Sequence, residues 1–180
     1  DGVGMLYDIH DTNNSNSEPD FSTLQGYPLV IWFTGDEFGG FAGPGSIGES
    51  ALALYIEAGG HVCMSSQDYL YDQGLTNFGQ TYLGIESYTS DVYQTSVVGA
   101  DLFEPLGSVT LNYPFSNWSD TVSPSSNALL AFDGNIGNAA VRLDGEHGGS
   151  AIFLGFPVEA MPVESQSDLM NELVAWLGAS

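Results

Sequence analysis

Residues 61 to 72, HVCMSSQDYLYD, hold the side chains of this chain that are best suited to nucleophilic chemistry. A cysteine or serine at a strand-to-helix turn is where many α/β enzymes keep their nucleophile. Such a nucleophile needs a neighbouring base to take its proton. The stretch contains the only cysteine and a polar run: Cys63, Ser65, Ser66, Gln67 and Asp68.

Three histidines are the candidate bases, and none stands in a hydrolase motif. His10 follows a predicted first strand, His61 begins the strand that leads to Cys63, and His147 lies in a predicted turn, DGEHGGS. There is no G-x-S-x-G sequence. A serine or cysteine hydrolase that uses Ser66 or Cys63 therefore stays open as an alternative without an assigned base.

The strand before this stretch has to extend to Ser65. If Cys63 stood at the turn, only two residues would remain after Gly60, and a strand usually needs about five residues. A turn at Ser65-Ser66 leaves Cys63 inside the strand, where a free cysteine is typically a buried hydrophobe. We expect Ser66 and Asp68 to cap the short helix that follows.

The elements around the stretch alternate between strand and helix. Residues 27–36 carry the continuous apolar run typical of a strand covered on both faces. A helix is predicted from 46 to 58, with Ser46 as N-cap and Glu49 at the capping-box position. The further predictions are strands at 5–11, 61–65 and 150–157, short helices near 69–71 and 78–83, a hairpin at 128–145, a helix at 165–178, and an irregular excursion at 84–127.

This order predicts a single α/β domain over residues 1–180, with three layers and a mostly parallel, flavodoxin-like sheet that includes a β-hairpin excursion. Ligands of such sheets lie outside the carboxyl ends of the strands. The segments TGDEF, SSQD and FPVEAMP reach that edge and predict a crevice formed by Asp36, Glu37, Ser65, Ser66, Gln67, Asp68 and Glu159.

The segments VIWFTGD, YIEAGGHVCMSSQDYLYD and FLGFPVEAM resemble, in this order, the class I glutamine amidotransferase-like superfamily. More narrowly, the chain resembles the domains of this kind that are attached to secreted bacterial and archaeal proteins, including peptidases. The resemblance covers about residues 5–178. It implies a further strand and helix before the first predicted strand, so we expect a fragment of a larger precursor.

The resemblance also implies a catalytic cysteine with a glutamine four residues on, which Cys63 and Gln67 match. It implies a His-Pro-Glu motif after a late strand, but here Phe156 precedes Pro157 and Glu159 is displaced by one residue. Without that histidine no base is present to form a thiolate. We therefore expect no amidotransferase activity.

The net charge of the chain limits the kinds of partner that it can bind. The chain has 23 acidic residues and one basic residue, Arg142, for a net charge of −22. This excludes nucleic acid and anionic membranes, which need Lys and Arg, and no apolar run reaches the ~18 residues of a membrane helix. A chain with one tryptic site suits a secreted, extracellular location.

The acidic surface favours a cation, and Ca²⁺ is the expected one. Candidate ligands in DTNNSNSEPD are Asp11, Asn13 and Asp20, although the EF-hand spacing is absent. Zinc ligand motifs are absent. Several aromatic residues lie in predicted loops and could stack on a sugar or anchor an interface: Tyr69, Tyr71, Tyr82, Tyr88, Tyr93, Tyr113, Phe115 and Trp118.

Together these features favour a non-catalytic extracellular domain for binding or assembly, with a degenerate amidotransferase-like crevice. Its expected partners are other domains of the same precursor, copies of itself, or a glycan. A sheet that lacks its first strand would offer an open edge for pairing. Besides the hydrolase, the second alternative is a Ca²⁺-dependent carbohydrate-binding module.

Overall fold

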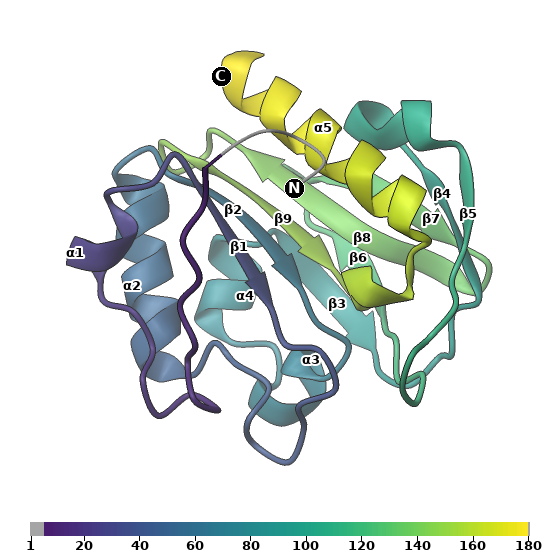
Figure 1. The fold of residues 1–180 in the computed structure, drawn as a ribbon, viewed down its shortest axis with the longest axis horizontal. Coiled ribbons are helices and arrows are strands. Elements are labelled where there is room, and N and C mark those ends of the chain that lie inside the picture. Colours follow the sequence, from purple (N-terminus) through teal and green to yellow (C-terminus); the bar gives the residue numbers. More distant parts are fainter. Residues whose placement is uncertain (1–5, 180) are drawn as a thin grey trace.

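The computed structural model describes residues 6–179. A seven-stranded sheet in the order β1-β2-β9-β8-β7-β4-β5 lies between two layers of helices (Figure 1), which confirms the three-layer α/β prediction. Its strands are β1 (Leu29–Phe33), β2 (His61–Ser65), β4 (Ser96–Gly99), β5 (Ser108–Thr110), β7 (Leu129–Gly134), β8 (Gly137–Asp144) and β9 (Ser150–Leu154).

The sheet is mixed. Parallel pairing joins β1, β2 and β9, and the predicted hairpin β7–β8 adds an antiparallel half that β4 and β5 extend. The excursion that was predicted to be irregular instead holds β4, β5 and a 3-10 helix, η1 (Asp101–Leu106). It also forms a separate antiparallel pair, β3 (Ile85–Thr89) and β6 (Thr121–Pro124). These strands were hard to predict because each is only three to five residues long and buries one or two residues.

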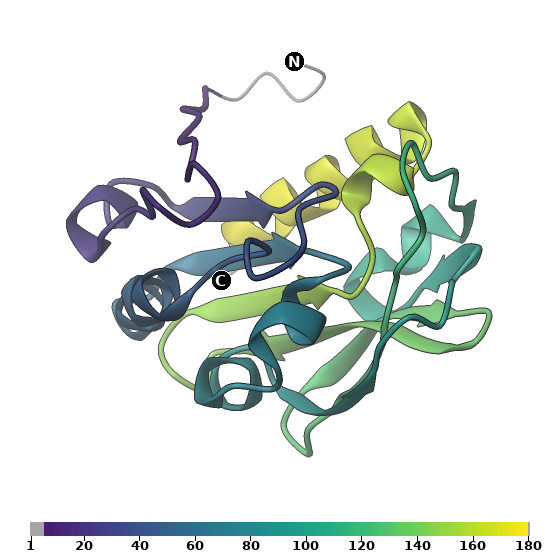
Figure 2. The ribbon, with the colours of Figure 1, turned by 90° about the horizontal axis from the view of Figure 1, so that it is seen from below.

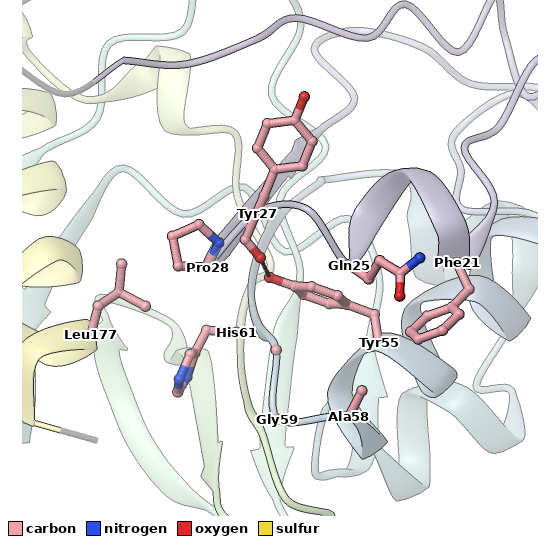
Figure 3. Close-up of a pocket in the computed structure, with 10 residues that line it drawn as sticks. Phe21, Gln25, Tyr27, Pro28, Tyr55, Ala58, Gly59, His61 and Leu177 are labelled. Atoms are coloured by element: carbon pink, nitrogen blue, oxygen red, sulfur yellow. Dashed lines mark hydrogen bonds between the residues drawn. The ribbon is translucent and has the colours of Figure 1, made fainter.

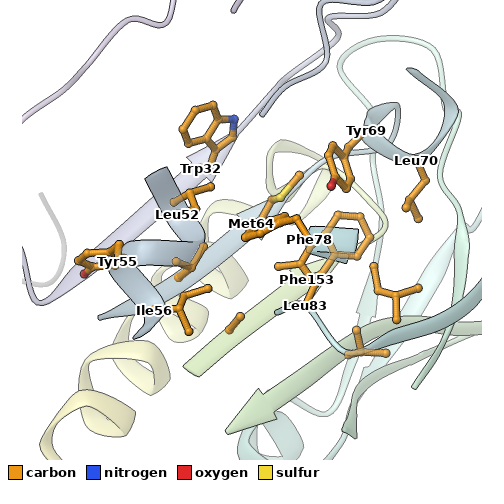
Figure 4. Close-up of a cluster of buried hydrophobic side chains, with 14 of the residues drawn as sticks. Trp32, Leu52, Tyr55, Ile56, Met64, Tyr69, Leu70, Phe78, Leu83 and Phe153 are labelled. Carbon is orange, nitrogen blue, oxygen red and sulfur yellow. The ribbon is translucent and has the colours of Figure 1, made fainter. Parts of the chain in front are cut away.

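Helices cover both faces of the sheet (Figures 1 and 2). One face packs on α1 (Phe21–Leu24), α2 (Ser46–Glu57), α3 (Tyr69–Gln73) and α4 (Asn77–Thr81); the other packs on α5 (Val163–Ala179), η1 and η2 (Val158–Ala160). Alternation along β2 sends Val62 and Met64 to the first core (Figure 4) and Cys63 to the second. None of the helices described is both long and apolar enough to cross a membrane.

Two strand predictions were wrong in part. The strand predicted at 5–11 is absent from residues 6–11, because no neighbouring strand pairs with them, and residue 5 lies outside the described chain. β1 forms as predicted but is not covered on both faces. It is one of the two edge strands of the sheet, and Ile31 and Phe33 are 37% and 60% exposed.

The start of α2 is capped from a distant loop. Gly45, not Ser46, is the N-cap residue, and it has no side chain to donate or accept. The carboxylate of Glu18 replaces it, accepting from the backbone N–H groups of Gly45 at 2.6 Å and Gly48 at 2.7 Å. A carboxylate at a helix N-terminus also complements the helix dipole. Glu49, the predicted capping-box residue, accepts instead from the Tyr69 hydroxyl at 2.7 Å.

We predict that Glu18→Ala destabilises the domain by about 2 kcal/mol, because it removes two charge-assisted hydrogen bonds and the cap of α2. Urea denaturation followed by circular dichroism measures this loss. The control is Glu86→Ala, which removes an exposed carboxylate from β3 with the same change in net charge. Equal stability of the two variants would contradict a capping role for Glu18.

Candidate functional site

The carboxyl ends of β1, β2 and β9 meet in a hydrogen-bonded junction. The N–H of Thr34 donates to the carbonyl of Ser65, and the N–H of Ser66 donates to the carbonyl of Leu154. The Ser65 hydroxyl donates to the carbonyl of Phe156 at 3.0 Å and accepts from the N–H of Val158 at 2.8 Å. Ser65 therefore fixes the loop that follows β9.

Ser66 is fully buried, and its oxygen serves the backbone. It accepts from the N–H of Tyr69 at 2.9 Å, at the start of α3, and from the Thr34 hydroxyl at 2.8 Å. Ser66 thus holds the start of α3 as a capping side chain does. Asp68 occupies the N-cap position, but its side chain makes no capping hydrogen bond, so the capping role predicted for Asp68 was wrong.

Cys63 lies inside β2 and is 2% exposed. Burial raises the pKa of its thiol to about 12. Phe156, at the position where the resemblance implies a histidine, is itself fully buried and packs edge-on against Phe132, with ring centroids 5.8 Å apart. The thiol therefore stays protonated at neutral pH, and the motif position for its base holds a core aromatic ring.

The three histidines lie away from this junction. His61 is the first residue of β2, at the opposite end of the strand from Ser65, and its ring contacts Trp176. The ring of His147, in the loop before β9, lies 3.0 Å from the carbonyl of Thr81. The ring of His10 lies 2.7 Å from the carbonyl of Ser17. None of these contacts places an imidazole beside Ser66.

Two buried aspartates lie behind the junction. Asp120 is fully buried, and burial together with the charges of Asp91 and Asp68 raises its pKa to about 8. Asp68 is 5% exposed, and burial together with the charges of Asp72 and Asp91 raises its pKa to about 6. Within residues 6–179, one carboxyl oxygen of each has no hydrogen-bond partner. Because its pKa is raised to about 8, the carboxyl group of Asp120 is largely protonated at neutral pH.

The loops that follow β1 and β9 carry a second pair of carboxyl groups, Asp36 and Glu159. Burial, then the charge of Asp36, raises the pKa of Glu159, whereas Asp36 itself is exposed. Glu37 is half-buried, and its N–H donates to the carbonyl of Thr34.

Gln67 is hydrogen-bonded to the segment that carries an aromatic pair, Tyr93 and Trp118. Its amide donates to the carbonyl of Ser116 and accepts from the N–H of Trp118 at 3.0 Å. The rings of Trp118 and Tyr93 lie 5.8 Å apart, and the residues are 40% and 50% exposed. The amide of Gln67 therefore fixes the backbone that presents an aromatic surface to solvent.

The predicted calcium ligands are engaged in local turns. Asp11 accepts from the N–H of Asn13 at 2.8 Å, and Asp20 caps α1 by accepting from Ser22 and Thr23. These contacts do not bring Asp11, Asn13 and Asp20 together. In the part of the chain that the structure describes, no group of three or more His, Cys, Asp or Glu residues could hold a metal ion.

A hollow of about 420 Å³ lies at the other end of the parallel strands (Figure 3). Phe21, Tyr27, Tyr55, His61 and Leu177 contribute to its walls. The Tyr55 hydroxyl donates to the carbonyl of Tyr27 at 2.7 Å, which ties α2 to the residues before β1. The hollow is open to solvent and lies at the starts of β1 and β2, whereas the junction around Ser65 lies at their ends.

The residues that sequence reasoning missed come from the excursion. Asp91 and Asp120 lie more than 20 residues after Asp68, and the N–H of Asp120 donates to the carbonyl of Gly155 at 2.7 Å. A Cβ at Gly155 would lie 3.2 Å from the carbonyl oxygen of Asp120, so glycine permits this close approach. No local pattern signals such a long-range contact.

Comparison with known proteins supports the fold alone. No protein-family profile and no curated protein matches the chain. A catalytic mutant of Gan42B, a GH42 β-galactosidase from G. stearothermophilus, is similar with a TM-score of 0.60 and 15% identity, over 84% of this chain and 22% of that chain. The cytoplasmic protein STM3548 from Salmonella typhimurium is similar over 91% of this chain and 77% of that chain, with a TM-score of 0.59 and 10% identity.

The mmIFT52 N-terminal domain is also similar, with a TM-score of 0.55 and 15% identity, over 91% of this chain and 82% of that domain. The chain therefore spans most of the length of two of these proteins but about a fifth of the β-galactosidase. All three identities are too low to carry a function across.

We predict that the domain is less stable at pH 8 than at pH 5, because burial raises the pKa of Asp120 to about 8. An unfolded aspartate titrates near pH ~3.9, so between these values the folded state binds more protons and loses stability as pH rises. Asp120→Asn should raise stability at pH 8 by a few kcal/mol, at roughly 1.4 kcal/mol per pKa unit, and flatten the profile.

Thermal melts at both pH values measure this effect. Asp168→Asn, on the exposed side of α5, gives the same change in net charge and controls for the general repulsion of a highly acidic chain. If both variants shift the profile equally, the dependence arises from net charge and not from the buried carboxyl group.

Proposed function

We propose that this chain is a non-catalytic, extracellular binding or assembly domain with a degenerate amidotransferase-like crevice. The observation that carries the proposal is the state of the crevice: Cys63 lies in the core with a raised pKa, and Phe156 fills the place of the base. Nucleophilic catalysis requires an activated nucleophile beside a base, and these residues supply neither.

The hydroxyl groups of the crevice support the same conclusion. Ser65 and Ser66 are buried, and their oxygens join β1, β2, β9 and the start of α3. A hydrolase that used Ser66 would have to break these contacts. The similarity to one part of a much longer β-galactosidase chain fits an accessory module, whose partners would be other domains of its precursor or copies of itself.

We predict that the domain releases no ammonia from glutamine and hydrolyses no p-nitrophenyl ester above the buffer rate. Cys63→Ala and Ser66→Ala should leave these rates unchanged, because neither residue has a base. Cys63 should also resist a thiol reagent until the protein is unfolded, since burial keeps the thiol inaccessible and protonated.

Circular dichroism checks that each variant is folded, because Ser66→Ala removes several hydrogen bonds. Ser116→Ala, at an exposed position near the crevice, is the matched serine control. Turnover by the wild-type chain that disappears in a folded Ser66→Ala variant and persists in Ser116→Ala would overturn the proposal in favour of a serine hydrolase.

A second candidate function is carbohydrate binding at the pair formed by Tyr93 and Trp118. Two neighbouring exposed aromatic rings can stack on the apolar faces of sugar rings. The backbone N–H of Trp118 donates to Gln67, which anchors the segment that carries this ring. A role for Ca²⁺ in this binding is a separate expectation that rests on the acidic composition.

For this candidate we expect Trp118→Ala to weaken polysaccharide binding about tenfold, equivalent to the loss of ~1.4 kcal/mol of contact energy. Affinity electrophoresis against a panel of soluble neutral polysaccharides measures the change. Tyr71→Ala removes an aromatic ring that is 65% exposed on α3 and serves as the control. A chelator arm tests Ca²⁺ dependence, and failure of every polysaccharide to retard the wild-type chain would exclude this candidate.

A further inference from the structure

The outer edge of β1 is an unprotected strand edge. β1 consists of five apolar residues, Leu29–Phe33, and within residues 6–179 it pairs with β2 alone. Ile31 and Phe33 are exposed on the face that α5 covers elsewhere in the sheet. Soluble proteins usually protect such an edge with charged residues, proline, a bulge or a covering segment. The five residues of β1 include no charged residue, proline or bulge, and no other strand in residues 6–179 pairs with its outer edge.

The segment Leu6–His10 has the complementary property. It forms no strand, yet its apolar side chains face solvent: Leu6 is 102% exposed and Ile9 is 81% exposed. The Tyr27 hydroxyl donates to the carboxylate of Asp8 at 2.6 Å, which holds the segment near the start of β1. In Figure 2 the segment lies beyond the β1 edge of the sheet, on the side away from β2.

We propose that the outer edge of β1 binds the Leu6–His10 segment of a second copy of this chain, which adds to the sheet as a further strand. This inference rests on the proposed assembly function and names its partner. The occupant is a second copy because one chain carries both the open edge and an exposed apolar segment beside it. In a reciprocal exchange, the segment of each copy pairs with the β1 edge of the other, so neither edge and neither segment is left exposed.

This pairing would give β1 hydrogen-bond partners at its outer edge and would bury apolar side chains of both segments. Strand addition gives hydrogen-bond partners to the outward N–H and C=O groups of β1. Alternation along an added strand puts residues 7 and 9 on one face. A register that places Ile9 on the same face as Ile31 and Phe33 would bury all three side chains.

The charge of the chain fixes how this association responds to salt. Each copy carries a net charge of −22, so repulsion opposes the approach of two copies. The screening length falls from about 30 Å at ~0.01 M salt to about 3 Å at ~1 M. Self-association should therefore strengthen as NaCl rises, whereas capture of a basic partner would weaken.

Directed cross-linking distinguishes exchange between copies from pairing within one copy. A chain carrying Ile9→Cys is mixed with a separate chain carrying Ile31→Cys under mild oxidation; Cys63 is buried and does not compete. We expect a mixed disulfide-linked species of twice the 19.1 kDa chain mass. Ile136→Cys, an exposed isoleucine outside the β1 edge, replaces Ile31→Cys in the control and should yield no such species.

Sedimentation velocity provides the second measurement. Phe33→Lys should weaken self-association at least about tenfold, since it places a charge on the apolar face beside the edge. Leu54→Lys makes the same change of charge at an exposed site on α2 and should leave association intact. A wild-type chain that stays monomeric at low and high salt, or a cross-link that forms only within a chain carrying both cysteines, would overturn the inference.

These outcomes are independent of the enzymatic test. A chain that dimerises through β1 and also hydrolyses glutamine or esters would overturn the non-catalytic proposal alone. A chain without turnover that remains monomeric would overturn the β1 inference alone.

Discussion

The scarcity of cationic side chains is the constraint on which the rest of this structure depends. Arg142 is the only Lys or Arg residue against 23 acidic residues, and it pairs with Asp101 and Asp144. Other carboxylates therefore accept hydrogen bonds from backbone N–H or hydroxyl groups: Glu18 caps α2, and Asp72 accepts from Gly39 and Ala42. Hydrogen bonds to charged groups are stronger than neutral ones, so these carboxylates position the loops around the crevice.

The same scarcity explains the chemistry of the crevice. No basic side chain offsets the burial of Asp68 and Asp120, so the pKa of each is raised and Asp120 remains largely protonated at neutral pH. The hydroxyls of Ser65 and Ser66 join the end of β2 to the segments that follow β1 and β9. The polar groups at this edge are thus engaged in maintaining the fold, which supports a binding or assembly role over turnover.

β1 is an apolar strand at the edge of the sheet, and it is less buried than its neighbours. β2 and β9 are buried on both faces, whereas β1 leaves Ile31 and Phe33 in contact with solvent. β1 (LVIWF) is more apolar than β9 (SAIFL) or β2 (HVCMS), so apolar composition does not distinguish an edge strand from a central one. The exposed apolar face of β1 and the exposed segment Leu6–His10 are therefore the features on which the proposed assembly rests.

The sequence by itself determined the elements whose signals are local. The strand length before Ser65 placed Cys63 in β2, apolar runs placed β1 and β9, and glycine residues marked the end of α2, because these patterns depend on neighbouring residues. Only the tertiary structure decided which strand lies at the edge, which distant carboxylate caps α2, and that Asp120 lies behind Asp68. Those contacts join segments far apart in sequence, so no local periodicity records them, and they exist only once the sheet order is set.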